Sequence, residues 1–169
     1  DFNPLLQPQE ECIEVDGLNI IPARFISDHR EYNAHTLRRK IYLHIAEFLA
    51  DIEETPDNEG FRILREFIET KLYRYADHRN NEDVTSRLSR YFNWGFLSPQ
   101  RAAIEVFKSD IDSVNKEAFL EELIVRRELS SNFCLYAKNY KGFDDIPHWA
   151  LMSLNAHRSD LRIHNYSTE

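Results

Sequence analysis

Hydroxyl and guanidinium groups gather within one short stretch of the sequence, residues 75–100, beside several aromatic rings. The polar members are Tyr75, Arg79, Thr85, Ser86, Arg87, Ser89 and Arg90, and the aromatic residues that follow are Tyr91, Phe92, Trp94 and Phe96. Hydroxyls and free backbone amides at a helix start, with arginines nearby, can hold a phosphate, and an aromatic surface can hold a ring system. The same pattern also fits a capped loop whose aromatic residues belong to the core, so the spacing alone does not identify a ligand.

A second group of charged and polar residues lies in a stretch with helical periodicity. Its members are Glu121, Glu122, Arg126, Arg127, Glu128 and Asn132. Glu122 and Arg126 are four residues apart, so on an α-helix they share a face and could be nothing more than a surface ion pair. Glu122 is flanked by Phe119 and Leu123, and an ionisable residue in an apolar stretch more often has a partner or a task.

Other common chemistries have no supporting motif in the sequence. The seven histidines form no HxxxH, HExxH or Cys/His cluster, so we expect scattered surface histidines and no metal site. The chain has no G-x-S-x-G elbow, Walker loop or G-x-G-x-x-G, which removes the usual support for acyl transfer, P-loop phosphoryl transfer and Rossmann dinucleotide binding. Cys12 and Cys134 form no CxxC pair, so we expect two free thiols in a reducing compartment.

The elements that must position these residues are predicted to be helices. Apolar residues recur at spacings of three and four from Thr36, a candidate N-cap, to Ile52. A candidate cap with a first-turn proline, Thr55-Pro56, starts a second amphipathic segment that ends near Leu72. With four glycines and little period-two alternation, the sequence predicts a mainly α, multi-helical domain without internal repeats.

Further helices are expected towards the C-terminal end. Ser98-Pro99 begins one, a longer one runs from about residue 115 to 136, and a last one fades near His157. The first 22 residues contain three prolines and one glycine, which favours an extended segment with one short strand, at 13–15 or 18–21.

Composition and charge exclude some classes of protein. At 169 residues and 42% hydrophobic, the chain has enough apolar side chains for one folded domain, and no apolar run approaches the 18 residues of a membrane span. We therefore expect an intracellular protein, which is cytoplasmic, or nuclear if the source is a eukaryote. The formal net charge of -8 disfavours a nucleic-acid partner at first sight. Residues 1–16 and 51–59 carry five acids each and no base, however, and the remainder has 21 basic and 19 acidic residues, so DNA binding is not excluded.

Several motifs and their order resemble the DNA photolyase/cryptochrome family. They are Tyr75-Ala-Asp-His-Arg79, Thr85-Ser86-Arg87-Leu88-Ser89, Leu97-Ser98-Pro99-Gln100 and Phe119-Leu120-Glu121-Glu122-Leu123-Ile124. The continuation over residues 126–134 and Pro147-His148-Trp149-Ala150 resembles the class II cyclobutane pyrimidine dimer photolyases. Residues 16–22 are similar to the end of the linker behind the antenna domain of that class, so the resemblance covers nearly the whole chain.

The resemblance implies a fold, a reaction and a set of site residues. Residues 1–30 would be an interdomain linker, and residues 31–169 the first half of the helical FAD-binding domain. The family is a group of DNA repair enzymes in which reduced FAD, excited by light, donates an electron to a pyrimidine dimer, whose ring splits before the electron returns. The positions that match FAD-binding residues of the family are Tyr75, Thr85, Ser86, Arg87, Leu88 and Ser89.

The resemblance also implies how the DNA partner is bound. Glu122 matches the glutamate that hydrogen-bonds the bases of the dimer and stabilises the charge that arrives on them. Arg79 and Arg126 fall at positions near the lesion or its phosphates. The dimer would be flipped out of the duplex into a pocket beside the flavin.

Other functions stay open on the sequence alone. The second helical half and the antenna domain of the family have no counterpart in these residues, so we expect a piece of a longer protein that is inactive in isolation and whose oligomeric state, self-association included, is undetermined. The alternatives are a non-catalytic helical interaction or nucleic-acid-binding module derived from a photolyase, and a cryptochrome-like flavin photoreceptor. Glu122 favours repair over photoreception.

Overall fold

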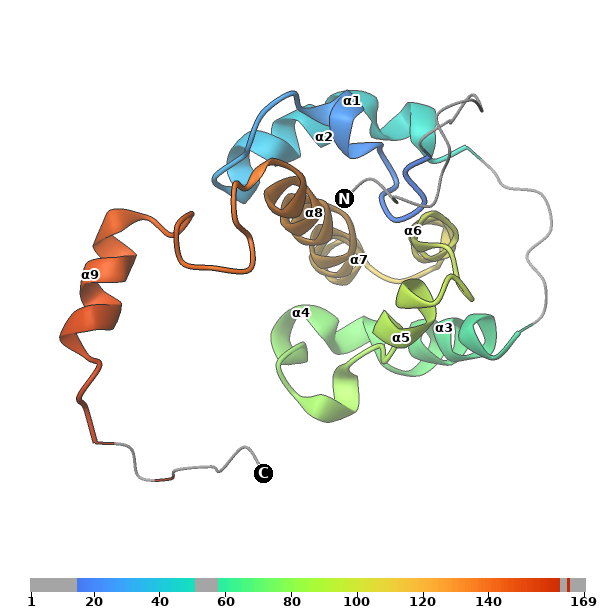
Figure 1. The fold of residues 1–169 in the computed structure, drawn as a ribbon. Helices are drawn as coiled ribbons and strands as arrows, with labels where there is room; N and C mark the ends of the chain where they lie inside the picture. Colours follow the sequence, from blue (N-terminus) through green and yellow to red (C-terminus); the bar gives the residue numbers. More distant parts are fainter. Residues whose placement is uncertain (1–14, 51–57, 162–163, 165–169) are drawn as a thin grey trace.

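The computed structural model describes residues 15–50, 58–161 and 164, and within these ranges the chain is helical with no strand (Figure 1). In chain order the α-helices are α1 (Ala23–Ile26), α2 (Ala34–Phe48), α3 (Glu59–Thr70), α4 (Tyr75–His78), α5 (Ser89–Asn93), α6 (Pro99–Lys108), α7 (Ser113–Leu120), α8 (Arg127–Tyr136) and α9 (His148–Ala156). Two 3-10 turns, η1 (Leu72–Arg74) and η2 (Glu82–Val84), flank α4, and a π-helical turn, η3 (Glu121–Arg126), joins α7 to α8. The prediction of a mainly helical fold is confirmed.

Side-chain caps decide where several helices begin. Ser98 accepts a hydrogen bond from the Arg101 N–H and Pro99 occupies the first turn, which confirms the predicted start of α6. The N-cap of α2 is Asn33, whose side chain accepts from the Thr36 N–H, so the prediction of Thr36 as the cap is wrong. The hydroxyl of Thr36 instead donates to the carboxylate of Glu31.

The second amphipathic helix is α3, which is capped by Asn58. The predicted cap at Thr55-Pro56 lies outside the described residues, as does Ile52, the last apolar position predicted for the first helix. The described part of that helix, α2, ends at Phe48.

One continuous helical run, from α7 through η3 to α8, passes through the middle of the molecule (Figure 1). It corresponds to the long helix expected at 115–136 and is capped by Asp112. α2, α6 and α7 contact η3, and α1 contacts α8. The fully or nearly fully buried side chains of the core come from this run and from α2, α3 and α6, and they include Leu37, Ile41, Leu64, Phe67, Val106, Phe119, Leu123, Ile124 and Val125. Burial of each such side chain stabilises the folded state by about 1.5–3 kcal/mol. The run is the centre of this core because helices pack on it from several sides.

The segment before α1 is held by the side chains of α8 and is not a strand. The N–H groups of Ile20 and Ile21 both donate to Oε1 of Glu128, at 2.8 and 3.3 Å. The strand predicted at 18–21 is therefore wrong, because a side chain and not a neighbouring strand binds these backbone groups. Of the alternative at 13–15, residues 13 and 14 lie outside the described residues. Ile20 and Ile21 are buried, and the domain boundary placed at residue 30 stays a prediction.

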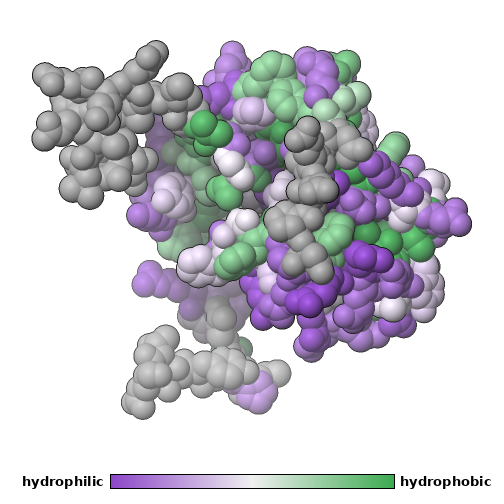
Figure 2. Space-filling model, turned by 90° about the vertical axis from the view of Figure 1, so that its right-hand side faces the viewer, coloured by the Kyte–Doolittle hydropathy of each residue, from purple (hydrophilic) through white to green (hydrophobic). Residues whose placement is uncertain are grey.

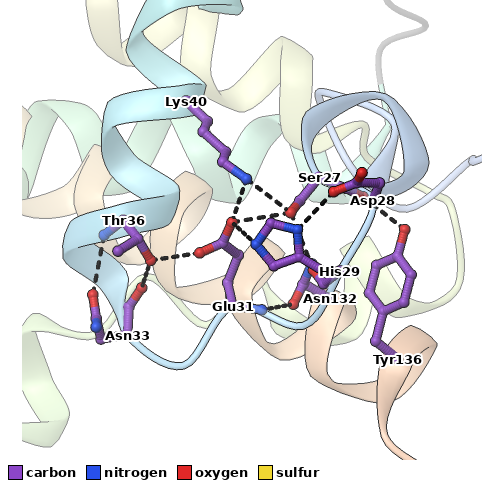
Figure 3. Close-up of polar contacts among 9 residues, drawn as sticks. All are labelled: Ser27, Asp28, His29, Glu31, Asn33, Thr36, Lys40, Asn132 and Tyr136. Carbon is purple, nitrogen blue, oxygen red and sulfur yellow. Dashed lines mark hydrogen bonds and ion pairs between the residues drawn. The ribbon is translucent and has the colours of Figure 1, made fainter.

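A buried carboxylate, Glu31, joins the chain between α1 and α2 to both helices (Figure 3). Its oxygens accept from the Thr36 hydroxyl at 2.5 Å and the Ser27 hydroxyl at 2.9 Å, and Lys40 Nζ lies 2.5 Å from Oε1. Its own N–H donates to Oδ1 of Asn132 on α8 at 2.7 Å. Burial opposes the charge, but Lys40 and the hydroxyls of Thr36 and Ser27 together lower the pKa of Glu31 to about 2.

Helix α9 lies apart from the other helices (Figure 1), and none of its residues is buried. Its large exposed apolar side chains are Trp149, Met152 and Leu154. Apolar side chains also reach the surface elsewhere, as the green areas among hydrophilic residues in Figure 2 show. None of the described helices has both the length and the apolar character needed to cross a membrane. Cys134 is a free, exposed thiol, and Cys12 lies outside the described residues.

Replacing Glu31 by Gln is expected to make the folded state less sensitive to acid. The pKa of Glu31 is about 2 in the folded chain against an ordinary value of 4.5, so its ionised form stabilises the fold above about pH 4.5 and loses that effect as the pH falls towards 2. In urea unfolding at stepped pH, the wild-type free energy of unfolding should fall by about 2 kcal/mol more than that of Glu31→Gln between pH 4.5 and 2. Glu47→Gln, at an exposed carboxylate of α2, is the control and should keep the wild-type pH dependence. Identical pH profiles for wild type and Glu31→Gln would refute this role.

Candidate functional site

An ion pair between α4 and η3 brings together two of the predicted site residues. Arg79, directly after α4, places Nη1 at 3.6 Å from Oε1 of Glu122. Both side chains are partly open to solvent, at 44% and 41% exposed. Helical spacing predicts an ion pair of Glu122 with Arg126, whereas in the structure Glu122 pairs with Arg79. Arg126 Nε lies 3.3 Å from Oε1 of Glu121 instead, because the π-helical turn brings residues five apart onto one face.

Tyr75 lies at the start of α4, on the apolar side of this pair. Its ring packs edge-on against Phe67 and Phe119, with ring centres 5.8 and 5.3 Å apart. Burial raises the pKa of the Tyr75 phenol, the carboxylate of Glu122 raises it further and Arg79 opposes both effects. The phenol is therefore a neutral hydrogen-bonding group at physiological pH.

Asn115 of α7 fixes the position of α4. Its Oδ1 accepts from the Ala76 N–H and its Nδ2 donates to the Tyr73 carbonyl, each at 2.8 Å. Its Nδ2 also donates to Asp112, the cap of α7. Nothing in the sequence pattern indicated Asn115, because its backbone partners lie about 40 residues earlier in the chain.

The hydroxyl-rich loop that follows η2 is anchored at both ends by buried side chains, Val84 and Leu88. Within it, the Thr85 hydroxyl donates to the Glu82 carbonyl at 2.8 Å. Arg87 adopts φ 56°, the left-handed region that costs a side-chain-bearing residue free energy. The guanidinium of Arg87 is 64% exposed and lies 3.5 Å from Glu82.

This loop has the donor groups that a phosphate needs, which fits a phosphate-bearing cofactor such as FAD. The side chains of Thr85 and Ser86 are half-buried, and those of Arg87 and Ser89 are exposed. Hydroxyls and a guanidinium within five residues supply uncharged and charged hydrogen-bond donors. Leu88 is fully buried, and its carbonyl accepts from the N–H groups of Tyr91 and Phe92, so this residue fixes the loop to the core. An ion pair between Arg74 and Asp83, at 2.9 Å, holds η2 against η1.

Ser89 also borders a pocket of about 240 Å³ between α5, α8 and the segment before α1. Its lining residues are Leu18, Ser89, Phe92, Asn93, Arg127 and Ser131. Apart from Arg126, which pairs with Glu121, the structure divides the predicted residues between two places. Tyr75, Arg79 and Glu122 meet at α4 and η3, and the loop over residues 85–89 leads away from them towards α8. Among the described residues, no group of three or more metal-ligating side chains occurs.

Comparison with known proteins adds a clear relationship. The chain is 33% identical to a deoxyribodipyrimidine photo-lyase of Potorous tridactylus over 211 residues, an alignment that includes all of this chain. The chain is homologous to one part of the photolyases. Deoxyribodipyrimidine photo-lyases of Arabidopsis thaliana and Methanothermobacter thermautotrophicus are 32% and 30% identical over more than nine tenths of the chain.

The photolyase relationship concerns only part of each relative. The chain spans about two fifths of the length of the curated photolyases that it matches, 39% to 42%. No family model matches the chain. The resemblance seen in the sequence motifs is confirmed, and the roles of the individual site residues stay predictions.

Substituting Asn115 by Ala is expected to loosen α4 and destabilise the fold by about 2 kcal/mol, because the Ala76 N–H and the Tyr73 carbonyl both lose their partner. Hydrogen exchange followed by mass spectrometry should show faster exchange in peptides covering residues 72–79. Asn155→Ala on the exposed helix α9 is the matched control and should leave this exchange unchanged. Wild-type protection of residues 72–79 in Asn115→Ala would show that α4 is held by other contacts.

Proposed function

We propose that this chain works in a deoxyribodipyrimidine photolyase of class II, which repairs cyclobutane pyrimidine dimers in DNA with light. The observation that carries the proposal is the meeting of Arg79 and Glu122 beside Tyr75, in a chain homologous to photolyases. Each of these three residues lies on a motif that resembles the photolyase/cryptochrome family, and the resemblance to class II comes from residues 126–134 and 147–150. A carboxylate and a guanidinium on a partly open surface can bind the edge and the phosphate of an extruded nucleotide.

In this proposal Glu122 is the catalytic residue. Its carboxyl group hydrogen-bonds the bases of the dimer and stabilises the negative charge that they carry while the ring opens. Arg79 orients Glu122 and contributes a positive charge at the same place. The helical turn that carries Glu122 is π-helical, a geometry that is rare and frequently found at functional sites.

FAD is the proposed cofactor, and when bound it supplies the light-driven electron. The residues that would hold it are Tyr75 and the loop over residues 85–89, where hydroxyls and Arg87 provide donors for the diphosphate. The strained backbone at Arg87 supports this role, because left-handed residues other than glycine concentrate at ligand-binding loops.

Flavin absorbance and dimer reversal test the proposal directly. The natural gene product, purified in the dark, should show bound flavin and should reverse dimers in irradiated oligo(dT) only under light. Flavin binding without repair would favour a cryptochrome-like photoreceptor, and DNA binding without flavin would favour a non-catalytic module. Either result would overturn the proposed reaction.

Glu122→Gln is expected to lower the repair yield by about tenfold or more while the flavin content stays at the wild-type level, because the variant keeps the shape of the site and loses its charge. The yield is measured as dimers reversed per absorbed photon. Glu117→Gln removes an equal charge from an exposed position on α7 and should repair at the wild-type yield. Unchanged repair in Glu122→Gln would remove this residue from the active site.

A further inference from the structure

Arg38 of α2 forms a two-point ion pair with Glu121, the neighbour of the proposed catalytic residue. Nε of Arg38 donates to Oε2 at 2.9 Å and Nη2 donates to Oε1 at 2.6 Å. The two parallel bonds fix the plane of both groups, and the side chains are 32% and 18% exposed. Arg38 lies 83 residues before its partner, so this contact is a product of the fold.

The same carboxylate contacts a second arginine. Nε of Arg126 lies 3.3 Å from Oε1 of Glu121. The hydrogen bonds from Arg38 lower the pKa of Glu121, and Arg126 adds to this effect. Glu121 is therefore ionised, and the three side chains together carry one net positive charge.

The two arginines of the triad differ in their exposure to solvent. Arg38 uses two of its nitrogens in the two-point pair and is 32% exposed, whereas Arg126 approaches through Nε and is 53% exposed. The Arg126 side chain is thus the most exposed of the three. A guanidinium held at one end and open at the other suits a phosphate oxygen.

We infer that Arg38 is a positioning residue that neutralises Glu121 and so keeps Arg126 available for a phosphate of the damaged DNA. This inference rests on the proposed function. Without Arg38, the ionised Glu121 would form a one-to-one neutral pair with Arg126, and the DNA-facing charge would be lost. Arg38 would then affect DNA binding although it lies behind Glu121 and does not touch the DNA.

A double-mutant cycle tests the inference, with a duplex oligonucleotide that contains one thymine dimer as the probe. Binding is measured in the dark between 50 and 200 mM salt for the wild type, Arg38→Gln, Arg126→Gln and the double variant. Loss of one phosphate contact lowers the slope of log affinity against log salt by about 1, so both single variants should show this loss. The double variant should show no further loss, because both changes remove the same contact.

Two controls separate positioning from general effects. Arg39→Gln removes the same charge from the next residue of α2, and its effect should add to that of Arg126→Gln. Arg38→Lys keeps the charge without the two-point geometry and should recover most of the salt dependence. Glu121→Gln frees both arginines and should bind at least as tightly as the wild type, which tests the idea even where Arg38→Gln folds poorly.

The outcomes distinguish this inference from the proposed function. Additive losses in the double variant, or an unchanged slope in Arg38→Gln, would overturn the positioning role and leave the photolyase proposal in place. Weaker binding by a folded Glu121→Gln would also overturn it. A wild-type protein that does not bind the dimer-containing duplex would overturn both.

Discussion

One row of side chains on α8 holds the N-terminal segment against the centre of the molecule. Glu128, Asn132 and Tyr136 follow each other at intervals of four, so they lie on one face of the helix. Glu128 receives the N–H groups of Ile20 and Ile21, Asn132 the N–H of Glu31, and Tyr136 donates to the carbonyl of Ser27. The orientation of α1 and α2 depends on these bonds, because a buried backbone group left without a partner costs about 1–3 kcal/mol.

The bonds from α8 also determine the geometry of the candidate site, because they position α2. Once the segment before α2 is fixed, Asn33 caps that helix and Leu37 and Ile41 enter the core. Arg38 then faces Glu121 across the interface between α2 and η3. The anchoring contacts and the proposed chemistry are therefore parts of one arrangement, in which the central helical run carries Glu122 in its middle and the anchoring side chains nearer its C-terminal end.

The sequence allowed a good prediction of the helices and a partial one of the site. Amphipathic periodicity and the Ser98-Pro99 start depend on neighbouring residues, and both were found as expected. The motifs also led to Tyr75, Arg79 and Glu122, which do lie together. Contacts between distant residues left no local signal. The burial of Ile20 and Ile21 under Glu128 depends on a partner 108 and 107 residues away, and the local proline and glycine content suggested an extended segment with a strand there.

The π-helical turn has a consequence for how the chain can vary. Each residue of an α-helix advances the direction of the side chain by about 100°, so inserting or deleting one residue within η3 rotates everything that follows by that amount. Glu122 precedes most of this turn and the face formed by Glu128, Asn132 and Tyr136 follows it. The length of this turn therefore fixes the rotation about the helix axis between Glu122, which would meet DNA, and the face of α8 that anchors the N-terminal segment. The number of residues between Glu122 and Glu128 is therefore constrained, in addition to the side chains at either end.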